Sequence, residues 1–116
     1  MSFHVERIEK IMEREIGSIL LTEVKDERLR YVIVTKVRVT NDLSIATVYY
    51  TVIGNENQKI STSENLEDAK GYIRSTLGKR IKIRKVPELK FKYDESLEYG
   101  AKIDSILKGL NTPKED

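Results

Sequence analysis

The sequence contains no cysteine, one histidine and two prolines among its 116 residues. Without cysteine the chain forms neither disulfides nor thiolate metal sites, and a cysteine nucleophile is excluded. Such a composition is typical of a reducing compartment, so we expect a cytoplasmic protein. The longest apolar run covers only residues 31–34. This run is too short for a membrane span or for the core of a signal peptide.

Residues that could carry catalysis do not form a recognisable motif. His4 is the only histidine and lies at the start of the chain without catalytic partners. Glu64, Glu67 and Asp68 cluster in sequence, but a metal site would need further ligands from elsewhere. A charged first helical turn explains them without a metal. Since a phosphate-binding glycine loop and a Ser-His-Asp set are also absent, we predict a non-enzymatic protein without cofactor, metal or small-molecule substrate.

Positive charge is concentrated in one part of the chain. The length predicts a single domain, and the formal net charge is only +2. Residues 70–92 nevertheless hold nine of the 21 basic residues and one acid, Glu88, while acids predominate elsewhere. Apolar residues run through the same segment, so its cations are displayed on a folded surface. This asymmetry indicates a polyanionic partner.

Hydrophobic periodicity predicts the element order α-β-β-α-α-β. The expected elements are a helix over 4–22, strands over 33–40 and 46–52 joined by a turn at 41–44, a polar loop over 54–62, helices from about 61 to 77, a strand over 81–93 interrupted at Pro87, and a last helix from Ser96. Ser61 and Glu64 have the spacing of a capping box. Ala69 and Gly71 mark an interhelical kink in the middle of the second helical stretch.

This order predicts an α+β fold with a three-stranded sheet and helices on one face. A right-handed crossover from the second strand, through the helices, reaches the third. The same order occurs in the type II KH fold, an RNA-binding module, although topology alone does not establish function. We expect one KH-like domain over residues 1–110 with a C-terminal helical extension, followed by a flexible tail over 111–116.

With these elements placed, the sequence resembles the ribosome-binding factor A family of bacterial assembly factors over about residues 5–107. The segments that carry the resemblance are VTKV at 34–37, TNDLS at 40–44, ATVY at 46–49, IRSTLGKR at 73–80 and VPELKFKYDESL at 86–97. The last two are long and adjacent, so chance similarity is a poor explanation.

The resemblance implies a KH-like domain in which the GXXG clamp loop is replaced by an Ala-x-Gly bend, here at residues 69–71. It also implies a cytoplasmic monomer that binds 16S rRNA on the free 30S subunit. The implied role is late maturation and processing of that rRNA, with importance for growth at low temperature. Glu27 departs from the family, which often has proline there, and leaves that loop less rigid.

A set of seven cations, here called the basic block, is the predicted RNA-binding site. Its members are Lys70, Arg74, Lys79, Arg80, Lys82, Arg84 and Lys85. Lys82 and Arg84 are expected on one face of a strand, opposite Ile81 and Ile83. Such a set can bind phosphates with little base readout. The alternatives are a solubilising face, or a small α+β interaction domain that docks an acidic protein.

Two further groups leave alternatives open. Lys36, Arg38, Lys90 and Lys92 occupy outward strand positions, where they either widen the footprint or protect exposed sheet edges from aggregation. The aromatic candidates for stacking on bases are Tyr31, Tyr49, Tyr72, Phe91 and Tyr93. Core or half-buried strand positions are the simpler explanation for most of them.

Overall fold

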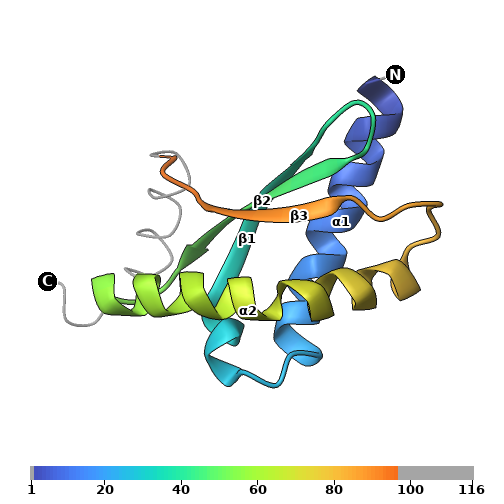
Figure 1. Cartoon of the computed structure of the whole chain (residues 1–116). Helices are drawn as coiled ribbons and strands as arrows, with labels where there is room; N and C mark the ends of the chain where they lie inside the picture. Colours follow the sequence, from blue (N-terminus) through green and yellow to red (C-terminus); the bar gives the residue numbers. More distant parts are fainter. Residues whose placement is uncertain (1, 97–116) are drawn as a thin grey trace, which may run out of the picture.

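The computed structural model describes residues 2–96, which form a mixed sheet and two long helices (Figure 1). The helices are α1 (Ser2–Thr22), the short 3-10 helix η1 (Glu27–Tyr31) and α2 (Glu56–Arg80), and the strands are β1 (Val32–Val39), β2 (Ile45–Val52) and β3 (Glu88–Tyr93). The predicted α+β class with a three-stranded sheet is confirmed for this part of the chain. The predicted last helix and the tail at 111–116 lie outside the described residues.

The sheet has the order β1-β2-β3. β1 pairs antiparallel with β2, and the register shifts at a bulge between Val34 and Lys36. β2 pairs in parallel with β3, so α2 carries the crossover that a parallel connection requires. β2 is therefore the central strand, and β1 and β3 are edge strands, each paired on one side only within residues 2–96.

A side-chain network closes the predicted turn between β1 and β2. The carboxylate of Asp42 accepts hydrogen bonds from the Ser44 backbone N–H at 3.1 Å, the Ser44 hydroxyl at 2.7 Å and the Thr40 hydroxyl at 2.8 Å. Leu43 has a φ of 63° and packs partly against the core. The Ser44 carbonyl then accepts from the Glu88 N–H at 2.9 Å. The turn is thereby joined to the start of β3.

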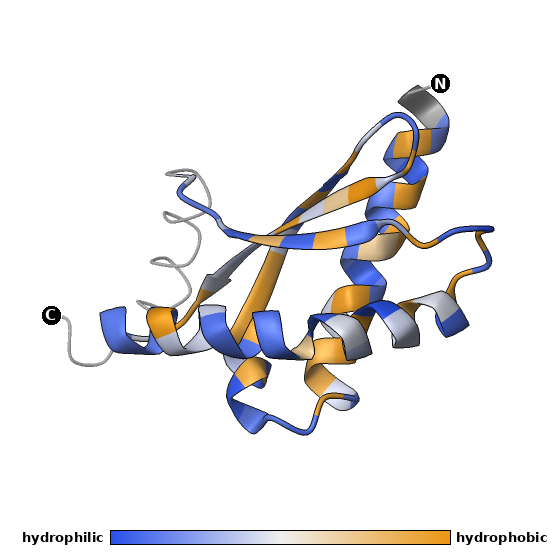
Figure 2. Ribbon diagram, viewed as in Figure 1, coloured by the Kyte–Doolittle hydropathy of each residue, from blue (hydrophilic) through white to orange (hydrophobic). Residues whose placement is uncertain are grey.

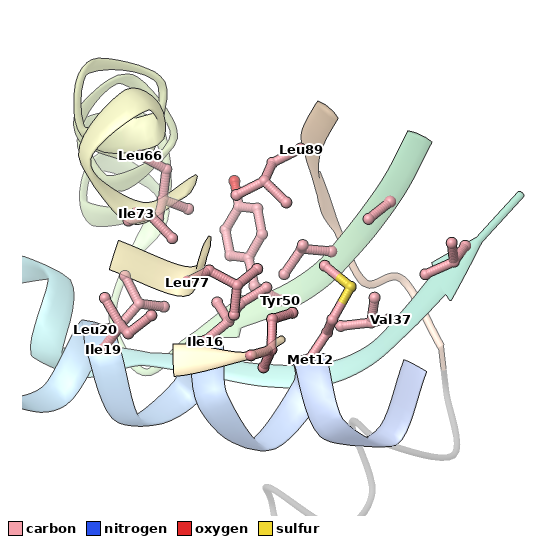
Figure 3. Close-up of a cluster of buried hydrophobic side chains, with 14 of the residues drawn as sticks. Met12, Ile16, Ile19, Leu20, Val37, Tyr50, Leu66, Ile73, Leu77 and Leu89 are labelled. Atoms are coloured by element: carbon pink, nitrogen blue, oxygen red, sulfur yellow. The ribbon is translucent and has the colours of Figure 1, made fainter. Parts of the chain in front are cut away.

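α1 and α2 cover one face of the sheet, and a single hydrophobic core lies between these helices and the sheet (Figure 3). The fully buried core side chains include Met12, Ile16 and Ile19 of α1, Val37, Val48 and Leu89 of the sheet, and Leu66, Ile73 and Leu77 of α2. In Figure 2, β3 alternates between hydrophilic and hydrophobic residues, whereas β1 begins with a continuous hydrophobic stretch. Within residues 2–96, neither α1 nor α2 covers the opposite face of the sheet, where Arg38, Lys90 and Lys92 are exposed.

α2 begins earlier than the sequence predicts, so the expected capping box at Ser61 and Glu64 is wrong. Asn55 caps the helix: its side chain accepts from the Gln58 N–H at 2.9 Å, and the Gln58 side chain accepts from the Asn55 N–H at 2.7 Å. Most of the predicted polar loop over 54–62 is therefore helical. Ile60 is the one large apolar residue in the first turns of α2, and it is exposed. The sequence of these turns therefore shows no helical periodicity of apolar residues.

α2 is one continuous helical segment rather than two helices. Ala69 is half-buried against the core, and Gly71 is exposed, with no neighbouring atom within 4 Å of an added Cβ. A change in the direction of the helix axis at these residues stays a prediction.

The predicted strand over 81–93 is wrong in its first half, because ladder pairing begins at Glu88. Residues 81–87 form an irregular connection instead. Pro87 lacks an N–H and cannot donate to a ladder, although its side chain is fully buried. Ile81 is buried and Ile83 is half-buried, so the apolar residues still point inward without a strand.

Candidate nucleic-acid interface

The basic block divides between α2 and the connection that follows it. Lys70, Arg74, Lys79 and Arg80 lie on the C-terminal half of α2, and the other three members lie on residues 81–87. Lys82 and Arg84 are exposed but do not share a strand, which corrects the predicted placement. Lys79 and Arg80 occupy the last turn of the helix, where positive charge is favourable to the helix dipole.

Arg74 holds the connection against α2. Its guanidinium donates from Nε to the Pro87 carbonyl at 3.0 Å and from Nη2 to the Val86 carbonyl at 2.5 Å. Val86 also packs closely against Gly78: a Cβ added to Gly78 would lie 3.1 Å from Cγ2 of Val86. Arg74 thus binds the protein's own backbone, and it fixes the segment that displays its neighbours.

Arg80 links the end of α2 to α1. Its guanidinium donates to the carboxylates of Glu23 at 2.9 Å and Glu15 at 3.1 Å, and to the Ser18 hydroxyl at 2.9 Å. The hydrogen bonds to Glu23 and Glu15 raise the pKa of Arg80 above its ordinary value. The two carboxylates offset its charge, and its side chain is only 25% exposed.

Lys70 is also paired, since its ammonium lies 2.8 Å from the Glu67 carboxylate one helical turn earlier. This pair is partly open to solvent, with the Lys70 side chain 30% exposed and that of Glu67 55% exposed. Surface pairs of this kind contribute little and exchange readily. Lys70 can therefore leave Glu67 for a stronger anion.

The remaining four members of the block are exposed, and within residues 2–96 their side chains make no hydrogen bond or ion pair. They are Lys79, Lys82, Arg84 and Lys85, here called the free cations. Three of them lie on the connection that Arg74 and the inward-pointing Ile81 and Ile83 hold in place. Figure 1 shows this connection at the far end of α2, where it protrudes from the molecule before returning as β3.

A groove of about 570 Å³ lies between the middle of α2 and the starts of β2 and β3. Its lining residues are Ser44, Ile45, Lys70, Gly71, Arg74, Lys85, Glu88 and Leu89. Three belong to the basic block, and Glu88 is the one acid among them. Gly71 contributes bare backbone to the wall, so a ligand could approach the helix closely at this point.

The aromatic candidates separate by exposure. Tyr31 and Tyr72 are 61% and 51% exposed, whereas Phe91 packs partly against the core. Tyr93 makes an edge-on contact with Tyr50, with 5.7 Å between ring centroids. Lys59 also lies over the Tyr93 ring, so this ring has its stacking partners inside the protein.

Among residues 2–96, no group of three or more histidine and acidic side chains converges closely enough to hold a metal ion. In that part of the chain no helix is long and apolar enough to cross a membrane.

Known proteins of one family are similar in sequence to this chain. The sequence model of the ribosome-binding factor A family matches residues 4–107. The chain belongs to this family. A ribosome-binding factor A from Staphylococcus saprophyticus is 50% identical over 111 residues, which cover 96% of this chain and 97% of that protein.

Solved structures of the family share the fold. The crystal structure of ribosome-binding factor A from Thermus thermophilus superposes with a TM-score of 0.68 at 24% identity, covering 77% of this chain and 93% of that one. A Thermus thermophilus ribosome binding factor A homology model, fitted into a cryo-EM map of a 30S complex, gives a TM-score of 0.64 at 24% identity. That match covers 76% of this chain and 92% of the other.

Two of the segments that resemble the family meet at the groove. The turn at 40–44 and the segment from Val86 onward are joined there by the hydrogen bond from Glu88 to Ser44. Sequence reasoning did not select Ser44, Glu88 or the anchoring roles of Arg74 and Arg80. The adjacency of the two segments was invisible because it depends on the parallel pairing of β2 with β3.

Proposed function

We propose that this protein is a non-enzymatic assembly factor that binds 16S rRNA on the free 30S subunit and assists its late maturation. The observation that carries the proposal is the set of free cations on an anchored connection, beside a groove with three basic side chains. Membership of the ribosome-binding factor A family supports the ribosomal partner. As a ribosomal factor it would act in the cytoplasm, as a monomer.

The mechanism is electrostatic docking on a preformed surface. Lys79, Lys82 and Lys85 would neutralise phosphates and release their counterions, which gives affinity with little sequence readout. Arg74 fixes the connection before binding, so less conformational entropy is lost when RNA arrives. The bound protein would hold a local rRNA conformation until a later factor or the mature subunit displaces it.

The groove is the counterpart that we propose for the RNA-gripping cleft of a KH domain. By the resemblance to the family, Ala69, Lys70 and Gly71 would take the place of the clamp loop of a KH domain. Lys70 contributes a charge at the groove wall, and Gly71 leaves the backbone accessible. Backbone contacts to one rRNA strand would therefore replace the reading of four single-stranded bases.

Co-sedimentation tests the ribosomal role. The wild-type chain should travel with free 30S subunits and be scarce on mature 70S particles and polysomes. Replacing Lys82 and Lys85 together by alanine should weaken the 30S association. The matched control replaces Lys10 and Lys25, which are also exposed lysines outside the block.

Two results would contradict the proposal. One is equal occupancy of polysomes and free 30S subunits by the wild-type chain. The other is failure to bind purified 16S rRNA in the absence of protein, which would favour an acidic protein partner instead.

A further inference from the structure

The open face of the sheet carries cations in an ordered arrangement. The register places Arg38 opposite Thr47 and Thr47 opposite Lys90. The next row joins Lys36, Tyr49 and Lys92 in the same way. Each row therefore has a cation on each edge strand and an uncharged residue on the central strand β2.

The spacing of these rows suits an extended polyanion. Residues two apart on a strand are roughly 6.6 Å apart, and the outer strands lie roughly 9.6 Å from each other. Lys90 and Lys92 thus form one line of charge along β3, and Lys36 and Arg38 form a parallel line along β1. The lines are separated by a strip that is too narrow for a duplex to lie in but wide enough for one chain of nucleotides.

Tyr49 lies in the middle of this strip. It is half-buried, and the Lys36 ammonium lies 4.8 Å from its ring centroid. The contact holds a cation over an aromatic ring that points to the exposed face. Because the lysine side chain is flexible, a base could take its place on the ring while the ammonium moves to a phosphate.

Acidic groups only partly offset this charge. Burial opposes the ionisation of Asp94, but the hydrogen bond that it accepts from Thr35 and the charge of Lys36 lower its pKa. Glu88 lies at the start of β3. Glu9 accepts from the Val39 N–H and lies 4.0 Å from the Arg38 guanidinium. Within residues 2–96, Lys90 and Lys92 make no ion pair and are exposed.

The cations of the open face follow the basic block along the chain. Lys85 lines the groove, β3 begins three residues later at Glu88, and Lys90 follows on the open face. We propose that the open sheet face is a second RNA-binding surface, which takes a single-stranded segment over Tyr49 with its phosphates along Lys90 and Lys92. This proposal rests on the proposed function, since it gives the same RNA partner a second contact.

Titration with a short unstructured oligoribonucleotide, of about 16 nucleotides, tests the proposal at several salt concentrations. Replacing Lys90 and Lys92 together by alanine should flatten the slope of log affinity against log salt by about 1.4, since single strands give about 0.7 per phosphate. Replacing Lys10 and Lys25 together should leave the slope nearly unchanged. A duplex of the same length should bind the parent and the Lys90/Lys92 variant alike.

A second pair of variants tests the aromatic contact. Tyr49→Phe keeps the ring and should keep the affinity within about twofold. Tyr49→Leu should lower the affinity by roughly fivefold or more, which is the lower end of base stacking. Circular dichroism of both variants checks that the sheet is intact, and the Lys90/Lys92 variant keeps the test valid if Tyr49→Leu unfolds.

The outcomes separate the two proposals. If the Lys90/Lys92 variant matches its control while the Lys82/Lys85 variant loses affinity, the second surface is wrong and the proposed function stands. If no variant differs from the control, both proposals fail. If the Lys90/Lys92 variant loses duplex binding equally, or only aggregates without losing affinity, the single-stranded assignment is wrong and the lysines protect the edge.

Discussion

Besides Lys70, which pairs with Glu67, the basic block contains two kinds of cation that the sequence does not distinguish. Arg74 and Arg80 are bound by the protein's own carbonyls and carboxylates, whereas the free cations Lys79, Lys82, Arg84 and Lys85 have no partner among residues 2–96. Arginine suits internal anchoring because its planar fork offers several fixed donors. The comparison shows that anchored residues shape the surface and free cations supply its available charge.

The largest effect should come from the packing beneath the block. Ala69 is half-buried against the core on the same helix. Ala69→Leu should overpack this position and lower the free energy of unfolding by about 1–3 kcal/mol. Urea denaturation measures the change. A variant as stable as the parent would show that the position is roomy, and that α2 can shift without disturbing the block.

Arg74→Ala should sharpen the comparison directly. The variant loses two charge-assisted hydrogen bonds to the connection, so its free energy of unfolding should fall by about 1–2 kcal/mol. Arg84→Ala is the matched control, since that arginine is exposed and free, and it should change stability by less than about 0.5 kcal/mol. Equal losses in urea denaturation would remove the distinction between anchored and free cations.

Gly71→Ala should move stability and binding in opposite directions. The helix gains up to about 1 kcal/mol because glycine is a poor helix former, and the added Cβ meets no neighbour. The same methyl group stands at the groove wall, so RNA affinity should fall. Melting temperature and RNA titration on the same sample measure both. Unchanged affinity would place the RNA away from the groove.

Acidification gives the smallest expected effect, and it probes a charge that stabilises the fold rather than one that binds RNA. Hydrogen bonds from Ser44 and Thr40 lower the pKa of Asp42. A carboxyl with a lowered folded pKa stabilises the protein above its unfolded pKa of about 3.9, and that contribution is lost as the pH falls through the folded value. The melting temperature should therefore drop below about pH 4, and less steeply in Asp42→Asn. An identical drop in both proteins would contradict the assignment.

Much of the fold could be predicted because β2 and β3 alternate between apolar and polar residues and α1 has an apolar stripe. The start of α2 could not be predicted, because even Ile60, the one large apolar residue of its first turns, is exposed. The capping box also consists of Asn55 and Gln58, whereas the prediction relied on a serine and a glutamate. Residues 81–87 alternated like a strand because Ile81 and Ile83 do point inward. This connection is held by the hydrogen bonds of Arg74 and by the contact of Val86 with Gly78, not by pairing with a neighbouring strand. Such tertiary contacts leave no periodic pattern in the sequence.

The candidate site was predicted as a set but not in its parts. Charge counting selected the seven members of the block from their closeness in sequence, and their role in RNA binding stays a prediction. It could not foresee that Glu15 and Glu23 of α1 reach Arg80, since that contact spans about half of the chain. The ordered rows on the open sheet face likewise required the register of β1 with β2 and of β2 with β3.

The salt dependence of binding to purified 16S rRNA tests the central claim most directly. Alanine at Lys79, Lys82, Arg84 or Lys85 should each flatten the slope of log affinity against log salt by roughly 0.7–0.9, one phosphate each. Lys25→Ala, which removes an equal charge from a residue that is also exposed but lies outside the block, should leave the slope nearly unchanged. Equal flattening by all five variants would mean that RNA senses only a diffuse field, and would contradict a binding surface built from the free cations.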